Sequence, residues 1–370
     1  MASRSVTVLR ESSEGMLEPP SRGALPGSGV RFDWLMVALG AWLIGGLYLD
    51  GWAHIHVPEL ETFFTPWHAV LYSGFVAGAG ALAAVFYRNT RRGASWSTAL
   101  PVGYGLSFVG VFIFLVAGVA DMLWHVVFGI EDGIEGLISP SHLALAVGGG
   151  LMVTGPLRAG LHGPSPSGQS WIARMPMVAS LTLFLSLITF FTEYASPYGT
   201  TWVTQPSAAG NKGAAFLYQS VGLAGFLVQP AVLTGLVLFV LRSRPLPLGS
   251  LTVLLSVNVA LMAIIHDKYL DTGPYPLIGA AVLAGLIGDA VLRWLRPSPV
   301  RIRAFRAVAF AIPALQYLSY FVAIMLWARV TWSAHLWTGA IAIAGGVGWL
   351  VSYLVVAPPR IAESDLNRGA

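Results

Sequence analysis

The sequence contains no cysteine, and only 10% of its 370 residues are charged. The absence of cysteine excludes disulfides, thiolate metal sites and catalysis by a thiol. The scarcity of charge excludes a soluble protein of this length, because the surface of a soluble domain carries far more Asp, Glu, Lys and Arg. No polar segment is long enough to form a soluble domain of its own.

Apolar stretches of helical length are abundant instead. The chain is 55% hydrophobic, contains 13 Trp and has a mean hydropathy of +0.70. Runs of about 20 apolar residues recur along it, which is the length of an α-helix that crosses a bilayer. They predict an all-α polytopic membrane protein with about ten transmembrane helices, at residues 32–54, 66–87, 99–126, 140–160, 174–194, 214–241, 249–268, 275–296, 303–329 and 334–357.

The predicted helices divide the chain into four parts. Residues 1–30 are polar and rich in Ser, Gly and Pro, without the apolar segment and cleavage site of a signal peptide, so we expect a disordered cytosolic tail. Residues 31–160 hold the first four spans, and residues 161–357 hold six more. Residues 358–370 form a second cytosolic tail.

The distribution of charge predicts the orientation. All of the 21 Lys and Arg residues except Lys212, Lys268 and Arg329 fall on the side of the N-terminal tail. The positive-inside rule therefore places both termini in the cytosol, in an inner (plasma) membrane. Most of the 17 acidic residues and every histidine except His162 fall on the opposite, extracytoplasmic side. The apolar helices make the lipid bilayer the expected partner. We expect no nucleic acid, because the basic residues are spread over many short loops and form no single basic patch.

A pattern of acid, histidine and proline occurs twice in the first half of the chain. The first copy reads Asp50-x3-His54, a short loop, and Glu61-x3-Thr-Pro-Trp-His68. Asp and His four residues apart share one face of a helix, and Thr-Pro is typical of an N-cap followed by proline in the first helical turn. The end of one helix and the start of the next therefore direct a carboxylate and two imidazoles toward a common point.

The second copy repeats this order of residue types. It reads Asp121-x3-His125, a longer loop, and Glu135-x3-Ser-Pro-Ser-His142. A single Asp-x3-His is a weak signal, whereas two copies with the same internal spacing favour metal ligation. We expect Glu61 and Glu135 to act as further ligands or as acceptors that orient the imidazoles. The predicted metal ligands are Asp50, His54, His68, Asp121, His125 and His142.

The residue types leave the identity of the metal open. Neutral imidazoles and carboxylates suit copper, zinc, iron or manganese, and the lack of Cys and Met in the motifs argues against a site for Cu(I) alone. Two interpretations without a metal stay open, namely a hydrogen-bonded polar cluster that joins the two helix hairpins and a proton or cation pathway.

A second cluster lies on the same predicted side of the membrane. His266 and Asp271 lie at the end of the seventh predicted span, and Glu193 lies at the end of the fifth. These residues could roof the same cavity or form a substrate entrance. An ordinary solvated loop explains them equally well.

The motif resembles a copper-binding segment of a known family. The motif is similar to the copper-binding segment in the C subunit of the copper membrane monooxygenases, which are the particulate methane and ammonia monooxygenases. In that segment Asp-x3-His is followed by an acidic loop and Thr-Pro-Ser-His. The resemblance covers about residues 45–160. The first ligand set would correspond to Asp50, His54 and His68. The second would correspond to Asp121, His125 and His142, with Asp121 where the family has Asn.

The resemblance implies a function in O2 chemistry. It implies copper as the cofactor, a small apolar or lipid-like substrate that reaches the site from the membrane, and an electron donor or partner subunits. Zinc or iron stay open as the metal. Two other classes also stay open: a metal transporter or storage protein, and a zinc-dependent membrane hydrolase in which Glu61 or Glu135 acts as the base. A purely structural role for the metal is a further alternative.

Overall fold

A computed structural model describes residues 29–57, 63–129, 133–163, 168–205, 212–266 and 273–356. Throughout these ranges the secondary structure is helical, without a strand. Eight of the helices in the described ranges are long and apolar enough to cross a membrane, or up to nine if a bent pair is one span. The chain is therefore a multi-pass helical protein that fits a lipid bilayer. The predicted count of about ten spans and the location of the termini stay predictions.

The first half of the chain forms two helix hairpins. Helix α1 (Val30–His56) packs against α2 (Pro66–Arg91), and α3 (Gly105–Phe128) packs against α5 (Pro140–Val153). A short helix, α4 (Ile134–Ile138), precedes α5. The predicted third span began at residue 99, but the helix begins at Gly105.

Both hairpins depend on a glycine where the two backbones come close. In the first hairpin, a Cβ atom on Gly74 of α2 would lie 2.8 Å from the backbone N of Leu43. In the second, a Cβ atom on Gly148 of α5 would lie 2.7 Å from the backbone N of Phe114. Such distances leave no room for a side chain, so small residues allow the close packing of these helices. Each glycine stands six residues after the histidine in the first turn of its helix.

The fourth predicted span is not one continuous helix. It consists of α5 and α6 (Gly155–His162), whose axes differ by 40° at the break. Pro156 lies at the start of α6 and has no N–H group, so one hydrogen bond of a continuous helix cannot form there. The helix therefore changes direction at Thr154.

The carbonyl groups beside this bend are bonded by side chains. Ser107 Oγ and Arg158 Nη2 donate to the carbonyl of Leu151 over 3.0 and 2.9 Å, and Ser180 Oγ donates to that of Val153 over 2.6 Å. An unpaired carbonyl in an apolar interior is costly, so these side chains stabilise the bend.

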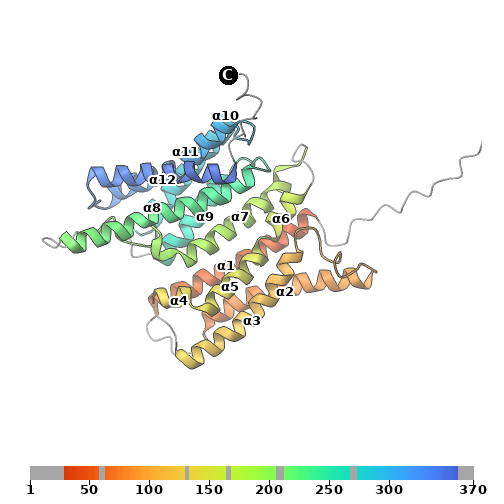
Figure 1. The fold of residues 1–370 in the computed structure, drawn as a ribbon. Helices are drawn as coiled ribbons and strands as arrows, with labels where there is room; N and C mark the ends of the chain where they lie inside the picture. Colours follow the sequence, from red (N-terminus) through yellow and green to blue (C-terminus); the bar gives the residue numbers. More distant parts are fainter. Residues whose placement is uncertain are drawn as a thin grey trace, which may run out of the picture.

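Helix α7 (Trp171–Phe191) joins the two halves of the molecule (Figure 1). It packs against α1, α5 and α6 on one side and against α8 and α9 on the other. A single turn of 3-10 helix, Glu193–Ala195, follows it. The remaining helices are α8 (Lys212–Leu241), α9 (Ser250–Ile265), α10 (Tyr275–Leu295), α11 (Ile302–Trp327) and α12 (Ala334–Val355). Helix α9 corresponds to the seventh predicted span, but with 16 residues it is shorter than the eight helices that could cross a membrane.

The chain direction sorts the polar residues to two ends of the bundle. The ends of α1 and α3 and the starts of α2 and α5 carry the motif histidines at one end. The last turns of α2 and α10 carry arginine at the other. We call these the histidine end and the arginine end.

Candidate metal centre

The first motif places three side chains around one point at the histidine end. Asp50 Oδ2 lies 3.9 Å from His54 Nε2, one turn further along α1, and 3.5 Å from His68 Nε2 in the first turn of α2. The predicted N-cap is confirmed, because Thr65 Oγ1 accepts a hydrogen bond from the backbone N–H of His68 and Pro66 follows it. Asp50 and His68 are buried, and His54 is more exposed.

The second motif forms an equivalent group. Asp121 Oδ1 lies 3.6 Å from His125 Nε2 on α3 and 3.0 Å from His142 Nε2 in the first turn of α5. Ser139 is the N-cap of α5, as predicted, and its side chain accepts from the backbone N–H of His142. Asp121 and His125 are buried in the structure.

The separations within each group fit a bound ion. Two ligand atoms that each lie about 2.0–2.2 Å from an ion, at an angle between 90° and 180°, are about 2.8–4.4 Å apart. The four measured separations run from 3.0 to 3.9 Å, and three of them are too long for a hydrogen bond. Within the described residues, Asp50 Oδ1 is also buried without a hydrogen-bond partner. Each Asp-His-His group could therefore hold a metal ion.

Hydrogen bonds orient two of the imidazoles. His68 Nδ1 lies 2.9 Å from Thr65 Oγ1, and His125 Nδ1 lies 3.3 Å from the carbonyl of Gly129. Because a carbonyl can only accept, His125 Nδ1 donates in this hydrogen bond, and its Nε2 faces Asp121. Histidines that ligate metals typically make this outer hydrogen bond. The C-cap Gly129 has φ +85°, a conformation that favours glycine.

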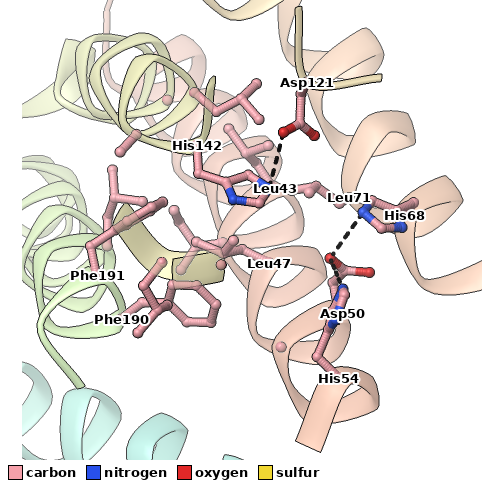
Figure 2. A pocket seen from close by; sticks show the side chains of 18 of the residues that line it. Leu43, Leu47, Asp50, His54, His68, Leu71, Asp121, His142, Phe190 and Phe191 are labelled. Atoms are coloured by element: carbon pink, nitrogen blue, oxygen red, sulfur yellow. Dashed lines mark ion pairs between the residues drawn. The ribbon is translucent and has the colours of Figure 1, made fainter. Parts of the chain in front are cut away.

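The two groups line the same cavity, which has a volume of about 170 Å3. Figure 2 shows Asp50, His54 and His68 on one side of it and Asp121 and His142 on the other. The remaining walls are mainly apolar and include Leu43, Leu47, Leu71, Leu145, Phe190 and Phe191. The two groups thus share one largely apolar compartment inside the helical bundle.

Two aromatic side chains of this region were not predicted from the sequence. Phe63 stacks on His68 at 5.0 Å between ring centroids and lies 6.0 Å from the His125 ring, so it contacts both groups. Tyr72 lines the cavity, and its buried hydroxyl has no hydrogen-bond partner in the described part of the chain. Tyr72 stands four residues after His68, on the same face of α2, and this spacing could have identified it.

Of the other predicted site residues, only some lie at or near the cavity. Glu193 lines the same cavity, and His266 Nε2 lies 3.5 Å from Glu193 Oε2. Glu135 is exposed in the first turn of α4 and belongs to neither Asp-His-His group. Glu61 and Asp271 lie outside the described residues.

Comparison of the chain with protein-family models, with curated proteins and with solved structures gave no match. The similarity to the copper membrane monooxygenases therefore rests on the motif residues alone.

Proposed function

We propose that this protein is a membrane metalloenzyme that holds one or two copper ions at the extracytoplasmic side of the plasma membrane. Its reaction would be the O2-dependent oxidation of a small apolar or lipid-like substrate. The observation that carries the proposal is that two Asp-His-His groups line one cavity whose other walls are mainly apolar.

The donor set suits copper. Asp50, His54 and His68 would hold one ion, and the equivalent residues of the second motif would hold another. Imidazole nitrogens and a carboxylate bind copper in either common oxidation state, although zinc and iron also accept them. Copper bound here would supply one-electron redox chemistry and activation of O2.

The protein's own residues prepare the cavity for this reaction. Thr65 and the carbonyl of Gly129 hold the rings of His68 and His125, so their Nε2 atoms stay directed inward. Phe190 and Phe191 limit water and favour an apolar substrate that enters from the bilayer. Glu193 lines the cavity, and His266 Nε2 lies 3.5 Å from its carboxylate, so the pair can exchange a proton at the edge of the cavity.

The overall reaction sets what else is required. In a monooxygenase reaction one oxygen atom enters a C–H bond of the substrate and the other leaves as water, which consumes two electrons and two protons. The electrons must come from an external donor, so the proposal includes an electron-donating partner.

Transport of the metal across the membrane is less well supported. Toward the arginine end, the helices that carry the motifs pack through Leu43, Phe75, Phe114 and Met152. Phe75 and Phe114 stack at 4.6 Å between ring centroids. Within the described residues, this apolar layer offers an ion no polar route directly beneath the two groups.

The first experiment is metal analysis of the detergent-purified protein together with electron paramagnetic resonance before and after reduction. We expect stoichiometric copper whose Cu(II) signal disappears on reduction. Stoichiometric zinc without a signal would replace this proposal with the zinc-dependent hydrolase. Protein that binds no metal after reconstitution would refute a metal site altogether.

Variants test the ligand assignment. His54→Ala and His125→Ala should each lower the bound metal, because each removes one ligand from one group. His335→Ala is the matched control, since His335 is an exposed histidine in the first turn of α12. Equal metal content in all three variants would contradict the assignment.

A further inference from the structure

A second and larger cavity lies at the arginine end of the bundle. Its volume is about 570 Å3, and it lies between the start of α7, the segment that joins α8 to α9, and the end of α10. Five arginines line it: Arg174, Arg242, Arg244, Arg293 and Arg296. The general preference for basic residues on one side of a membrane explains arginine at this end, but not the convergence of five around one cavity.

The one acidic residue in the lining does not neutralise these arginines. The carboxylate of Asp289 accepts hydrogen bonds from the backbone N–H of Leu251 at 3.1 Å and of Thr252 at 3.0 Å, and from Thr252 Oγ1 at 2.7 Å. It therefore caps the start of α9. Among the described residues it forms no ion pair with an arginine. The cavity keeps a strong positive charge.

The wall of the cavity is preorganised. Arg174 Nη2 donates to the carbonyl of Pro245 over 2.5 Å, and Ser250 Oγ donates to that of Pro247 over 2.6 Å. The prolines restrict the backbone, so the α8–α9 segment is held against α7. Arg293 and Arg296 are exposed, and within the described ranges their side chains form no hydrogen bond or ion pair. Their guanidinium groups are available to a ligand.

Arg296 also occupies an unfavourable backbone conformation. It follows α10 with φ 46° and ψ 61°, and it is the only residue other than glycine with a positive φ in the described part of the chain. Helices commonly end with glycine in this left-handed conformation, because a side chain is strained there. An arginine at such a position indicates a role for its side chain.

The outer face of α10 indicates what kind of ligand approaches the cavity. Leu283, Leu286 and Ile287 are exposed along this helix, and Arg293 and Trp294 are exposed near its end. Because their spacing follows the helical repeat, an apolar surface leads directly to the arginines. Acyl chains could lie along the leucines while a phosphate group reaches the guanidinium groups.

We propose that this cavity binds the phosphate headgroup of an anionic phospholipid, with the acyl chains along α10. Basic pockets between transmembrane helices are known to suit such headgroups. The inference is independent of the metal centre, which lies at the opposite end of the bundle.

Lipid binding to the intact, detergent-purified chain tests the proposal. Native mass spectrometry with added phosphatidylglycerol, with phosphatidylcholine and with inorganic phosphate compares the three ligands. The test variant is Arg293→Gln combined with Arg296→Gly. The control is Arg91→Gln, an exposed arginine at the same end of the bundle but on α2.

We expect the wild type to prefer phosphatidylglycerol over phosphatidylcholine, and the double variant to bind phosphatidylglycerol roughly 25-fold more weakly, about fivefold for each arginine. The control variant should bind as the wild type does. Arg296→Gly alone should weaken binding without lowering the melting temperature, because glycine relieves the backbone strain; this separates ligand binding from folding. Unchanged lipid affinity in both test variants would overturn the site. Inorganic phosphate that binds as tightly as the lipid would overturn the assignment to a phospholipid.

Discussion

Thr65 makes two hydrogen bonds at the first Asp-His-His group, and comparison of variants can separate their effects. Its hydroxyl accepts from the backbone N–H of His68 at 3.1 Å, which caps α2, and lies 2.9 Å from His68 Nδ1, which fixes the ring. Thr65→Val keeps the shape and removes both bonds. Loss of the cap lowers stability by about 1 kcal/mol. Loss of the bond to the ring lowers metal affinity by about 10- to 100-fold, or roughly 1.4–2.7 kcal/mol.

Two other variants provide the comparison. Ser139→Ala removes the cap of α5 and should lower stability by a similar amount of about 1 kcal/mol. Its hydroxyl bonds the backbone N–H of His142 and the Ser141 hydroxyl, so metal affinity should change little. Thr65→Ser retains a hydroxyl and should restore most of the affinity.

The assays are competition with a chelator of known affinity and thermal unfolding in detergent. If Thr65→Val and Ser139→Ala lower metal affinity equally, the loss comes from the helix ends and the proposed orientation of His68 is wrong. Unchanged affinity in Thr65→Val would refute it as well.

Three further predictions concern packing and buried polar groups. Gly74→Ala should destabilise the protein by about 1–3 kcal/mol in a thermal unfolding assay, because its Cβ atom would lie 2.8 Å from the backbone of α1. Gly80→Ala on the same helix is the control: its Cβ atom meets nothing within 4 Å, so stability should not fall. Arg158→Met should destabilise the bend between α5 and α6 by about 1–3 kcal/mol, since it removes donors to buried carbonyls, while Arg88→Met, at an exposed site, should not; equal melting temperatures would contradict this. Tyr72→Phe should leave metal content unchanged and should not lower the melting temperature of the metal-free protein, because the hydroxyl that it removes is buried without a partner in the described structure; a clear decrease would show that this hydroxyl has a stabilising partner.

Most of the helices and the two Asp-His-His groups could be predicted because they depend on local sequence. The apolar runs determine where the helices lie, and a four-residue spacing places Asp50 beside His54. Thr65 and Ser139 identify the helix starts through their capping chemistry. These features involve neighbours in the chain, and no long-range contact is needed to recognise them.

Other features depend on how distant segments pack. The placement of both groups at one cavity results from the contact of α1 and α2 with α3 and α5, and the sequence does not specify that contact. The bend near Pro156 could be suspected from the proline, but its stabilisation by Ser107 and Ser180 involves residues from other helices. Glu135 matched the motif and yet is exposed, because α4 directs it away from the cavity lining.

The residues of the two Asp-His-His groups all lie between positions 50 and 142, whereas other parts of the cavity wall come from later in the chain. Each group spans a single hairpin, and both are complete once residue 142 has been synthesised. Phe190 and Phe191 of α7 belong to a later part of the chain. Both Asp-His-His groups are therefore synthesised before the helix that closes this side of the cavity. If the two groups hold metal as proposed, the ion could enter before α7 packs against α1, and the order of synthesis would decide when the site becomes enclosed.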